Sequence, residues 1–203
     1  STLVKDLNEQ GKIYDAAALA YPTDSRAFNN AGAVAYMQGN ISKAKTNLEK
    51  ALNLKDNSKT KNNLAGVAMS QGDRAAAKKL LAQVKDKSAE VSYNNAAIMI
   101  LEGSYSNAIS SMIAPSFNKA LAQVLNGNVE DASTTLSSSK DKDAADAFYL
   151  KAIIAARSNA GVDAVVSNLK SAIAKDKKFK EKAAKDREFI KFMNDASFTA
   201  AVN

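Results

Sequence analysis

The sequence predicts an all-α protein, an α-solenoid of antiparallel helix pairs that ends in a capping helix. Three similar stretches begin at Phe28, Lys61 and Tyr93, so the period is 32 to 33 residues. Such a period is typical of helical repeat arrays, whose units bury their apolar faces only against neighbours. The composition agrees: 46% of the 203 residues are hydrophobic but only 6% are aromatic, which suits closely stacked helices. With 8 Gly and 2 Pro, turn residues are too sparse for a β-sandwich or barrel.

The residue types that are absent narrow the function. The chain contains no Cys and no His, so thiolate chemistry and the commonest general base are excluded. No GxGxxG, Walker or GxSxG pattern occurs. The densest acidic group is Asp141, Asp143 and Asp146, but it lacks the Gly and the closing Glu of a calcium loop. We therefore expect no enzyme, no cofactor and no metal. No window of 18 apolar residues predicts a transmembrane segment.

The helices can be predicted from periodicity. In the first full unit, Phe28, Ala31 and Ala35 recur at i, i+3 and i+7, which places them on one face of a helix. Gly39 with Asn40 is predicted to end this helix, because both tolerate a left-handed backbone. A second helix is expected from about Ser42, and its apolar face carries Ala44, Leu48, Ala51 and Leu52. Two antiparallel helices thus form one unit.

Small residues occur at matching positions in successive units. The first unit supplies Phe28, Ala31, Gly32, Gly39, Ala44 and Ala51. The second has Lys61 in place of the bulky residue and then supplies Leu64, Ala65, Gly72, Ala77 and Leu81. The third supplies Tyr93, Ala96, Ala97, Gly103 and Ala108. In this pattern the units resemble the tetratricopeptide repeat (TPR) family, and we expect the chain to be a TPR domain of a bacterial multi-repeat protein. The resemblance implies a right-handed superhelix whose first helices line a concave groove.

The repeat pattern divides the chain. Residues 1–24 are expected to form a partial first repeat, with a short first helix from Val4 to Asn8 and a turn at Gly11. Repeats are then expected at about 25–57, 58–88, 89–114, 115–143 and 144–175, the last two beginning their first helices near Phe117 and Tyr149. Residues 176–203 are predicted to form a capping helix and an aromatic tail with Phe189, Phe192 and Phe198. The incomplete first unit is compatible with a domain of a longer protein.

Candidate binding residues follow from the resemblance, as a stripe on each first helix opposite its packed face. The stripes are, in the first three full units, Arg26, Asn30, Ala33 and Met37, then Lys59, Asn63, Gly66 and Ser70, then Val91, Asn95, Ile98 and Leu101. Repeated Asn amides can pair with both N–H and C=O of an extended peptide. In the fourth and fifth units the corresponding positions hold Lys119 and Lys151, which could anchor a carboxylate.

A structural use of these asparagines is the alternative, since an Asn on a first helix can hydrogen-bond to the adjacent helix. The preceding asparagines, Asn29, Asn62 and Asn94, are expected to be solvated near their helix starts.

These features predict a non-catalytic scaffold that binds a peptide segment or helix of a partner protein. The alternative is a structural spacer or oligomerisation module of a larger cell-envelope protein; the oligomeric state stays open. A bacterial periplasmic or envelope location is expected, with the cytoplasm as the alternative.

Binding of nucleic acid or an anionic surface is a further alternative, because the net charge is +7 and residues 170–191 hold nine Lys or Arg against four Asp or Glu. Helical spacing of Lys178 with Glu181 and of Lys182 with Asp186 instead indicates an ion-paired, solvated helix.

Overall fold

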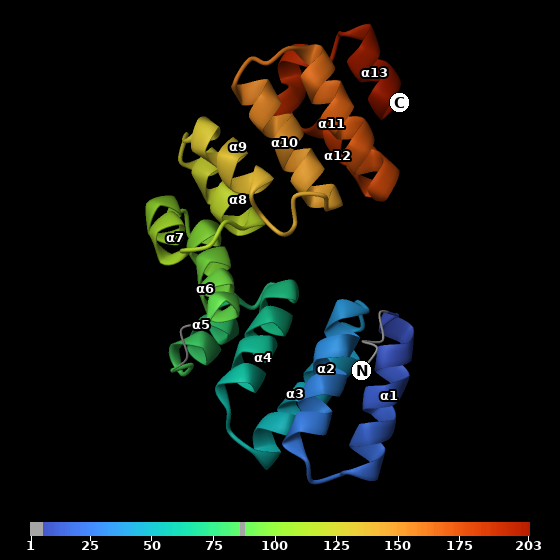
Figure 1. The fold of residues 1–203 in the computed structure, drawn as a ribbon, viewed down its shortest axis with the longest axis vertical. Helices are drawn as coiled ribbons and strands as arrows, with labels where there is room; N and C mark the ends of the chain where they lie inside the picture. Colours follow the sequence, from blue (N-terminus) through green and yellow to red (C-terminus); the bar gives the residue numbers. More distant parts are fainter. Residues whose placement is uncertain (1–5, 86–87) are drawn as a thin grey trace. The chain divides into compact units, whose positions relative to one another are not determined.

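The computed structural model consists of helices joined by short turns, and it describes residues 6–85 and 88–203 (Figure 1). It contains two compact units, Ser1–Ile98 and Met99–Asn203. The first holds α1 (Leu7–Ala20), α2 (Ser25–Met37), α3 (Ile41–Leu54), α4 (Ser58–Ser70), α5 (Arg74–Ala82) and most of α6 (Ala89–Leu101). The second continues with α7 (Tyr105–Ser111), α8 (Phe117–Leu125), α9 (Val129–Ser137), α10 (Ala145–Arg157), α11 (Val162–Lys175), α12 (Lys178–Lys185), the 3-10 helix η1 (Arg187–Phe192) and α13 (Ala196–Val202).

Consecutive helices pack in pairs, and the described ranges contain no β-strand. The all-α solenoid of helix pairs that the sequence predicts is therefore confirmed. Gly39 and Gly72 connect the helices of the first two full pairs with φ of 77° and 78°, and the glycines at the corresponding later turns also have positive φ. Asn40 does not share this role, contrary to the prediction. It has φ of −85°, and its Oδ1 accepts a hydrogen bond from Lys43 N at 3.1 Å, so it caps α3.

Small side chains allow the two helices of each pair to approach closely. Alanines on three second helices are completely buried, among them Ala44, Ala77 and Ala132. On α2, Gly32 faces α3 so closely that a Cβ atom there would lie 2.6 Å from Leu48 Cγ and 3.1 Å from the main-chain oxygen of Ala44. Packing distance is thus set by residue size at the helix crossings.

The apolar cores of the first unit lie between successive helices. One cluster joins α1, α2 and α3 around Phe28, and the next joins α2, α3 and α4 around Leu48. A third cluster joins α4, α5 and the start of α6 around Leu81. Each helix therefore buries its apolar face against near neighbours in the chain, as repeat arrays do.

Helix α1 differs from the prediction. Gly11 lies inside this helix and is buried, so the predicted turn at Gly11 is wrong; Val4 lies outside the described residues. The exposed side chain of Gln38 lies against α1 at this point. A Cβ atom at Gly11 would lie 2.6 Å from Gln38 Nε2, which donates a hydrogen bond to the main-chain oxygen of Leu7 at 2.8 Å.

The second unit ends in an aromatic core. A first cluster joins α8, α9 and α10 around Leu136. A second joins α10 and α11 to α12, η1 and α13, and it buries Phe179, Phe189 and Phe198 almost completely. Tyr149 stacks on Phe179 with ring centroids 4.8 Å apart and meets Phe189 edge-on at 5.7 Å. The C-terminal segment thus covers the last helix pair, as a cap does, with three helical elements.

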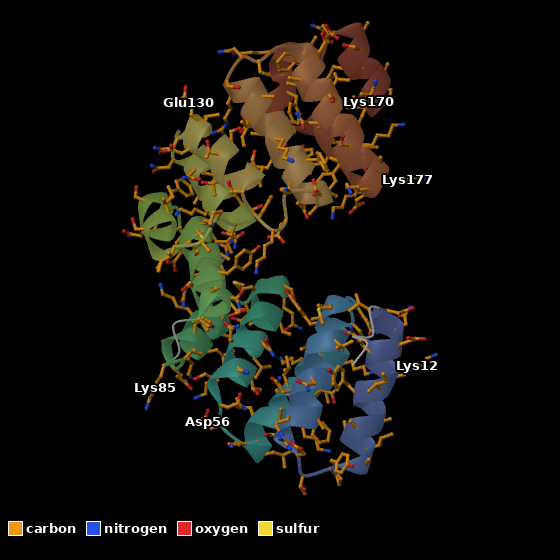
Figure 2. The ribbon with its side chains drawn as sticks, viewed as in Figure 1. Lys12, Asp56, Lys85, Glu130, Lys170 and Lys177 are labelled. Carbon is orange, nitrogen blue, oxygen red and sulfur yellow. The ribbon has the colours of Figure 1, made fainter. Side chains whose placement is uncertain are left out.

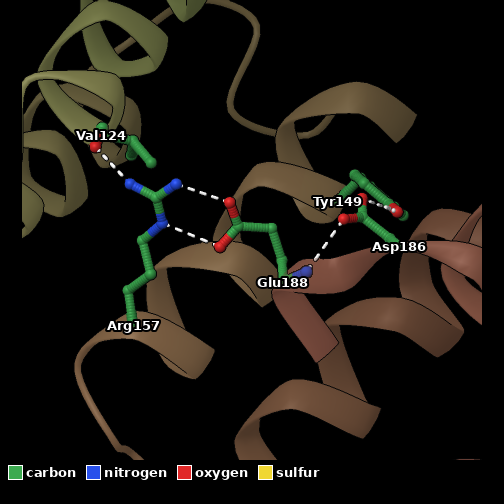
Figure 3. A network of polar contacts seen from close by, with 5 residues as sticks. All are labelled: Val124, Tyr149, Arg157, Asp186 and Glu188. Atoms are coloured by element: carbon green, nitrogen blue, oxygen red, sulfur yellow. Dashed lines mark hydrogen bonds and ion pairs between the residues drawn. The ribbon is translucent and has the colours of Figure 1, made fainter. Parts of the chain in front are cut away.

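Polar contacts fasten this cap at two points (Figure 3). Arg157 on α10 donates from Nε and Nη2 to the carboxylate of Glu188, at 2.8 and 2.5 Å, and from Nη1 to the main-chain oxygen of Val124 on α8. Tyr149 donates from its hydroxyl to Asp186 Oδ2 at 2.7 Å. Burial, together with this carboxylate, raises the pKa of Tyr149 above its ordinary value, so the phenol remains a donor. The bidentate Arg–carboxylate pair orients η1 against α10.

A pair of glycine substitutions tests the close helix approach. Gly32→Ala should lower the free energy of unfolding by roughly 1–3 kcal/mol, because the new methyl overlaps Leu48 and the α3 backbone. Gly66→Ala should raise it by about 0.5–1 kcal/mol, because Ala favours the helix. Its Cβ would meet only Tyr36, at 3.9 Å. Urea unfolding followed by circular dichroism measures both. Equal effects of the two substitutions would contradict the packing described for Gly32.

A second test concerns the cap. Tyr149→Phe should lower the free energy of unfolding by roughly 1–3 kcal/mol, because a buried hydroxyl that donates to a carboxylate is lost while the ring stays. Tyr21→Phe is the matched control, since the Tyr21 side chain is 64% exposed, and its effect should stay within about 0.5 kcal/mol. The same urea experiment compares them, and a Tyr149→Phe variant as stable as the control would show that the hydroxyl does not fasten the cap.

Candidate functional site

A cleft of about 960 Å³ opens in the first unit where α2 begins, α3 ends and α4 begins. Its lining combines hydroxyl, amide and charged side chains with one apolar side chain, Leu54. The lining residues are Thr23, Asp24, Ser25, Arg26, Asn29, Asn30, Leu54, Lys55, Asn57, Ser58 and Lys59. Three residues predicted for the binding groove, Arg26, Asn30 and Lys59, are therefore brought together by the structure.

Two helix caps build the walls of this cleft. Asp24 caps α2 by accepting from Arg26 N at 2.9 Å, and Asn57 caps α4 by accepting from Thr60 N at 2.9 Å. The hydroxyl of Thr60, which is fully buried, lies 3.1 Å from both Asn57 Oδ1 and Asn29 Oδ1. Asn29 on α2 is thereby tied to the first turn of α4, so the two walls are held by hydrogen bonds.

The charges of the cleft are partly neutralised within it. Arg26 donates from Nη2 and Nε to the Asp24 carboxylate, with the shortest contact at 2.8 Å. These hydrogen bonds lower the pKa of Asp24 to about 2, and Asp24 raises the pKa of Arg26. Lys55 and Lys59 are exposed and have no carboxylate partner among the described residues. The cleft therefore combines an Arg–Asp pair with two ammonium groups that no acid neutralises.

The asparagine pairs connect successive first helices. Asn63 Nδ2 on α4 donates to Asn29 Oδ1 on α2 at 3.1 Å, and Asn94 Nδ2 on α6 donates to Asn62 Oδ1 on α4 at 2.9 Å. Asn62 is only 8% exposed. The expectation that Asn29, Asn62 and Asn94 are solvated is therefore wrong, because each makes a contact with the neighbouring repeat.

The remaining predicted groove residues lie elsewhere. Met37 is exposed at the far end of α2, and Asn95 donates to the main-chain oxygen of Val91 in its own helix at 3.1 Å. Lys119 is half-buried on α8, and Lys151 on α10 donates to the main-chain oxygen of Lys142 at 2.7 Å.

Two residues of the predicted third stripe do not face a groove. Val91 and Ile98 are buried, at 7% and 4% exposure, in the cluster shared with α4 and α5. The face of α6 that meets α4 and α5 therefore differs from the face that the register of the first two units assigns to packing.

Several cleft residues were missed by the sequence prediction. Asp24, Lys55 and Asn57 lie in the connections between helices, which the repeat pattern treats as spacers. A signal for them exists in the chain: Asp24-Ser25-Arg26 recurs 33 residues later as Asn57-Ser58-Lys59. In both walls of the cleft, a helix-capping Asp or Asn is thus followed by Ser and then by a basic residue.

Other classes of site are not formed by the described residues. Within residues 6–85 and 88–203, no group of three or more His, Cys, Asp or Glu side chains is placed to hold a metal ion. The acidic group of Asp141, Asp143 and Asp146 lies in and just after a turn between α9 and α10. In the same described ranges, none of the helices has the length and apolar character that crossing a bilayer requires.

Comparisons with known proteins give matches among solved structures. No family model matches the chain, and no curated protein sequence matches it. Among solved structures, the chain is similar to YrrB, a TPR protein with an unusual peptide-binding site. The two are 20% identical, with a TM-score of 0.43, and the match covers 86% of this chain and 80% of that chain. That binding site is a property of YrrB.

The Asp24–Arg26 pair gives a pH-dependent prediction. Folding lowers the pKa of Asp24 from 3.8 to about 2, so the stabilisation that this carboxylate gives is present above pH 3.8 and is lost as the pH falls to about 2. Arg26→Gln should move the Asp24 midpoint upward toward 3.8, because the guanidinium hydrogen bonds are removed. Carbon-detected NMR titration of the carboxyl measures the midpoint. Lys12→Gln removes the same charge elsewhere and should not move it; an unchanged midpoint in Arg26→Gln would contradict the pair.

Proposed function

We propose that the chain is a non-catalytic protein-interaction scaffold whose cleft between α2 and α4 binds an extended segment of a partner protein. The observation that carries this proposal is the cleft itself, which brings Arg26, Asn30 and Lys59 together from two helices. Its volume of about 960 Å³ is near the upper end of ordinary ligand sites. Its walls are held by Asn29, Thr60 and Asn57, so the site is largely ordered before a partner arrives.

The side chains of the cleft suit a peptide backbone and an acidic group. The exposed amide of Asn30 offers donors and an acceptor, which suits an extended backbone. Lys55 and Lys59 favour a carboxylate beside that backbone. Arg26 can exchange part of its contact with Asp24 for a contact with the partner, since its side chain is 86% exposed. The cleft therefore fits an extended segment that carries at least one Asp or Glu.

The other residues that were predicted for the groove lie outside the cleft and have different roles in this proposal. Met37 lies on the same helix as Asn30, and Asn63 lies on α4 beyond Lys59. Asn63 contacts Asn29, so in this proposal it positions the wall and does not read the partner. Asn95 and Lys151 donate hydrogen bonds to main-chain oxygens, and Lys119 is half-buried. None of the three is needed for binding in the cleft.

A peptide selection tests the cleft. Random peptides are selected on the full chain, and the dissociation constant of the best peptide is measured by fluorescence polarisation on wild type and variants. Asn30→Ala with Lys59→Ala should weaken binding by roughly ten-fold or more, because hydrogen bonds and one charge contact are lost. Asn53→Ala with Lys12→Ala is the control, since both residues are exposed on α3 and α1 outside the cleft, and it should change binding less than two-fold by the same reasoning.

Two outcomes would contradict the proposal in different ways. Equal binding of wild type and the cleft variant would place the peptide elsewhere on the chain. Failure to enrich any peptide above an unrelated helical protein would favour the spacer or oligomerisation module, which equilibrium sedimentation of the chain can then examine.

A further inference from the structure

Four ammonium groups gather on three aromatic rings in the second unit. Lys151 and Lys175 place Nζ 4.4 and 5.7 Å from the ring centroid of Phe148. Lys178 and Lys182 place Nζ 5.0 and 5.6 Å from the centroid of Phe179, and Lys182 also lies 4.5 Å from that of Tyr149. Phe148 and Tyr149 are adjacent on α10, and Tyr149 stacks on Phe179. These four lysines, the lysine cluster, therefore form one surface across α10, α11 and α12.

The acidic residues nearby neutralise only one member of this cluster, Lys178. Neither ion pair predicted from helical spacing forms: Lys178 pairs with Asp176 at 2.8 Å, and Glu181 pairs with Lys185 at 2.7 Å. Asp186 accepts from Tyr149 and from the main chain of Glu188. Glu188 itself is held by Arg157 (Figure 3).

The balance of charge in the cluster is therefore positive. Asp146 on α10 also acts electrostatically on Lys178, so that lysine is the neutralised member. Lys151, Lys175 and Lys182 have no carboxylate partner among the described residues. Lys170 and Lys177 add two further exposed cations to α11 and its connection to α12 (Figure 2). Like charges on one surface repel one another, and a bound anion relieves the repulsion.

We propose that the lysine cluster is a second interaction surface, which binds an acidic segment of a partner protein. The ammonium groups lie over aromatic rings, and this cation–π attraction favours their positions before a partner binds. Each ammonium is a point charge with three rotatable donors, which suits carboxylates at varied angles along a flexible chain. This surface belongs to the second unit and is independent of the cleft, so it goes beyond the function proposed for the cleft.

The chemistry of the cluster favours a protein partner over the other polyanions. Tyr149 and Phe179 are 3% and 1% exposed, so bases cannot stack on their rings as they do in single-strand binders. The cluster contains Lys and no Arg, and it therefore lacks the planar forks that bind phosphates in two places. Helices that bind membrane surfaces expose large apolar side chains beside basic ones, whereas on α12 Phe179 is turned into the core.

A matched set of charge variants tests the surface in the full chain. The probe is a fluorescein-labelled peptide of alternating Glu and Ser, and anisotropy gives its affinity at low salt. Lys175→Gln with Lys182→Gln should weaken binding roughly three- to ten-fold, as expected for two exposed charge contacts. Lys12→Gln with Lys85→Gln removes the same charge from exposed positions of the first unit (Figure 2) and should weaken it less than two-fold. Lys175→Arg with Lys182→Arg keeps charge and ring contacts and should retain binding.

Every outcome of this experiment bears on the proposal. Equal weakening by both Gln pairs would show that net charge alone binds the peptide, and equal affinity for a Gln/Ser peptide would show that charge is not used; either result overturns it. Tighter binding of single-stranded DNA or of phosphatidylserine vesicles, lost in the same cluster variant, would assign the surface to those partners instead. If the Gln pair lowers the melting temperature, Lys177→Gln, which has no ring contact, should still weaken peptide binding measurably. Cleft variants should leave this affinity unchanged, which separates the two sites.

Discussion

Close contact between the two helices of each pair is the constraint on which the rest of the structure depends. Alanines such as Ala44 and Ala77 are completely buried at these contacts, and on α2 only a glycine fits opposite Leu48. Helices that approach so closely leave little room for a long connection, and the turn is made by a glycine with positive φ. Core clusters then form between each pair and the next, so stability is distributed along the chain.

The same close stacking decides what the asparagine pairs do. Because α2, α4 and α6 follow one another as first helices, amides of successive asparagine pairs come within hydrogen-bonding distance. Asn29 meets Asn63, and Asn62 meets Asn94. One asparagine of each contact is at least partly withdrawn from solvent, where an unpaired amide would be costly. The asparagine pairs therefore serve mainly to join successive repeats. Asn30 on α2 is the member that stays exposed in the cleft.

Sequence alone predicts the periodic part of this structure and not the rest. Gly39, Ala44 and their equivalents predict helix pairs, because the glycine makes the turn and the alanine lies at the helix contact in successive units. Arg26 and Asn30 were predicted on the stripe of one first helix and Lys59 on the stripe of the next, and all three line one cleft. The burial of Val91 was not predicted, because the face of α6 that meets α4 and α5 is not the one that the repeat register assigns to packing. Nor were the ring contacts of Lys182, since they depend on α10 and α12, which are distant in the chain.

The C-terminal cap shows how packing and surface charge are linked. The contacts that hold the cap use the carboxylates of Asp186 and Glu188, which a simple helical pattern would pair with neighbouring lysines. Because those carboxylates bind Tyr149 and Arg157, fewer acidic partners remain for the lysines of α12. Lys178 and Lys182 instead lie over the buried rings of Phe179 and Tyr149. A residue such as Tyr149 therefore has two roles, because its hydroxyl fixes the cap while its ring holds an ammonium group. Stability of the array's end and the positive charge of its surface arise from the same contacts.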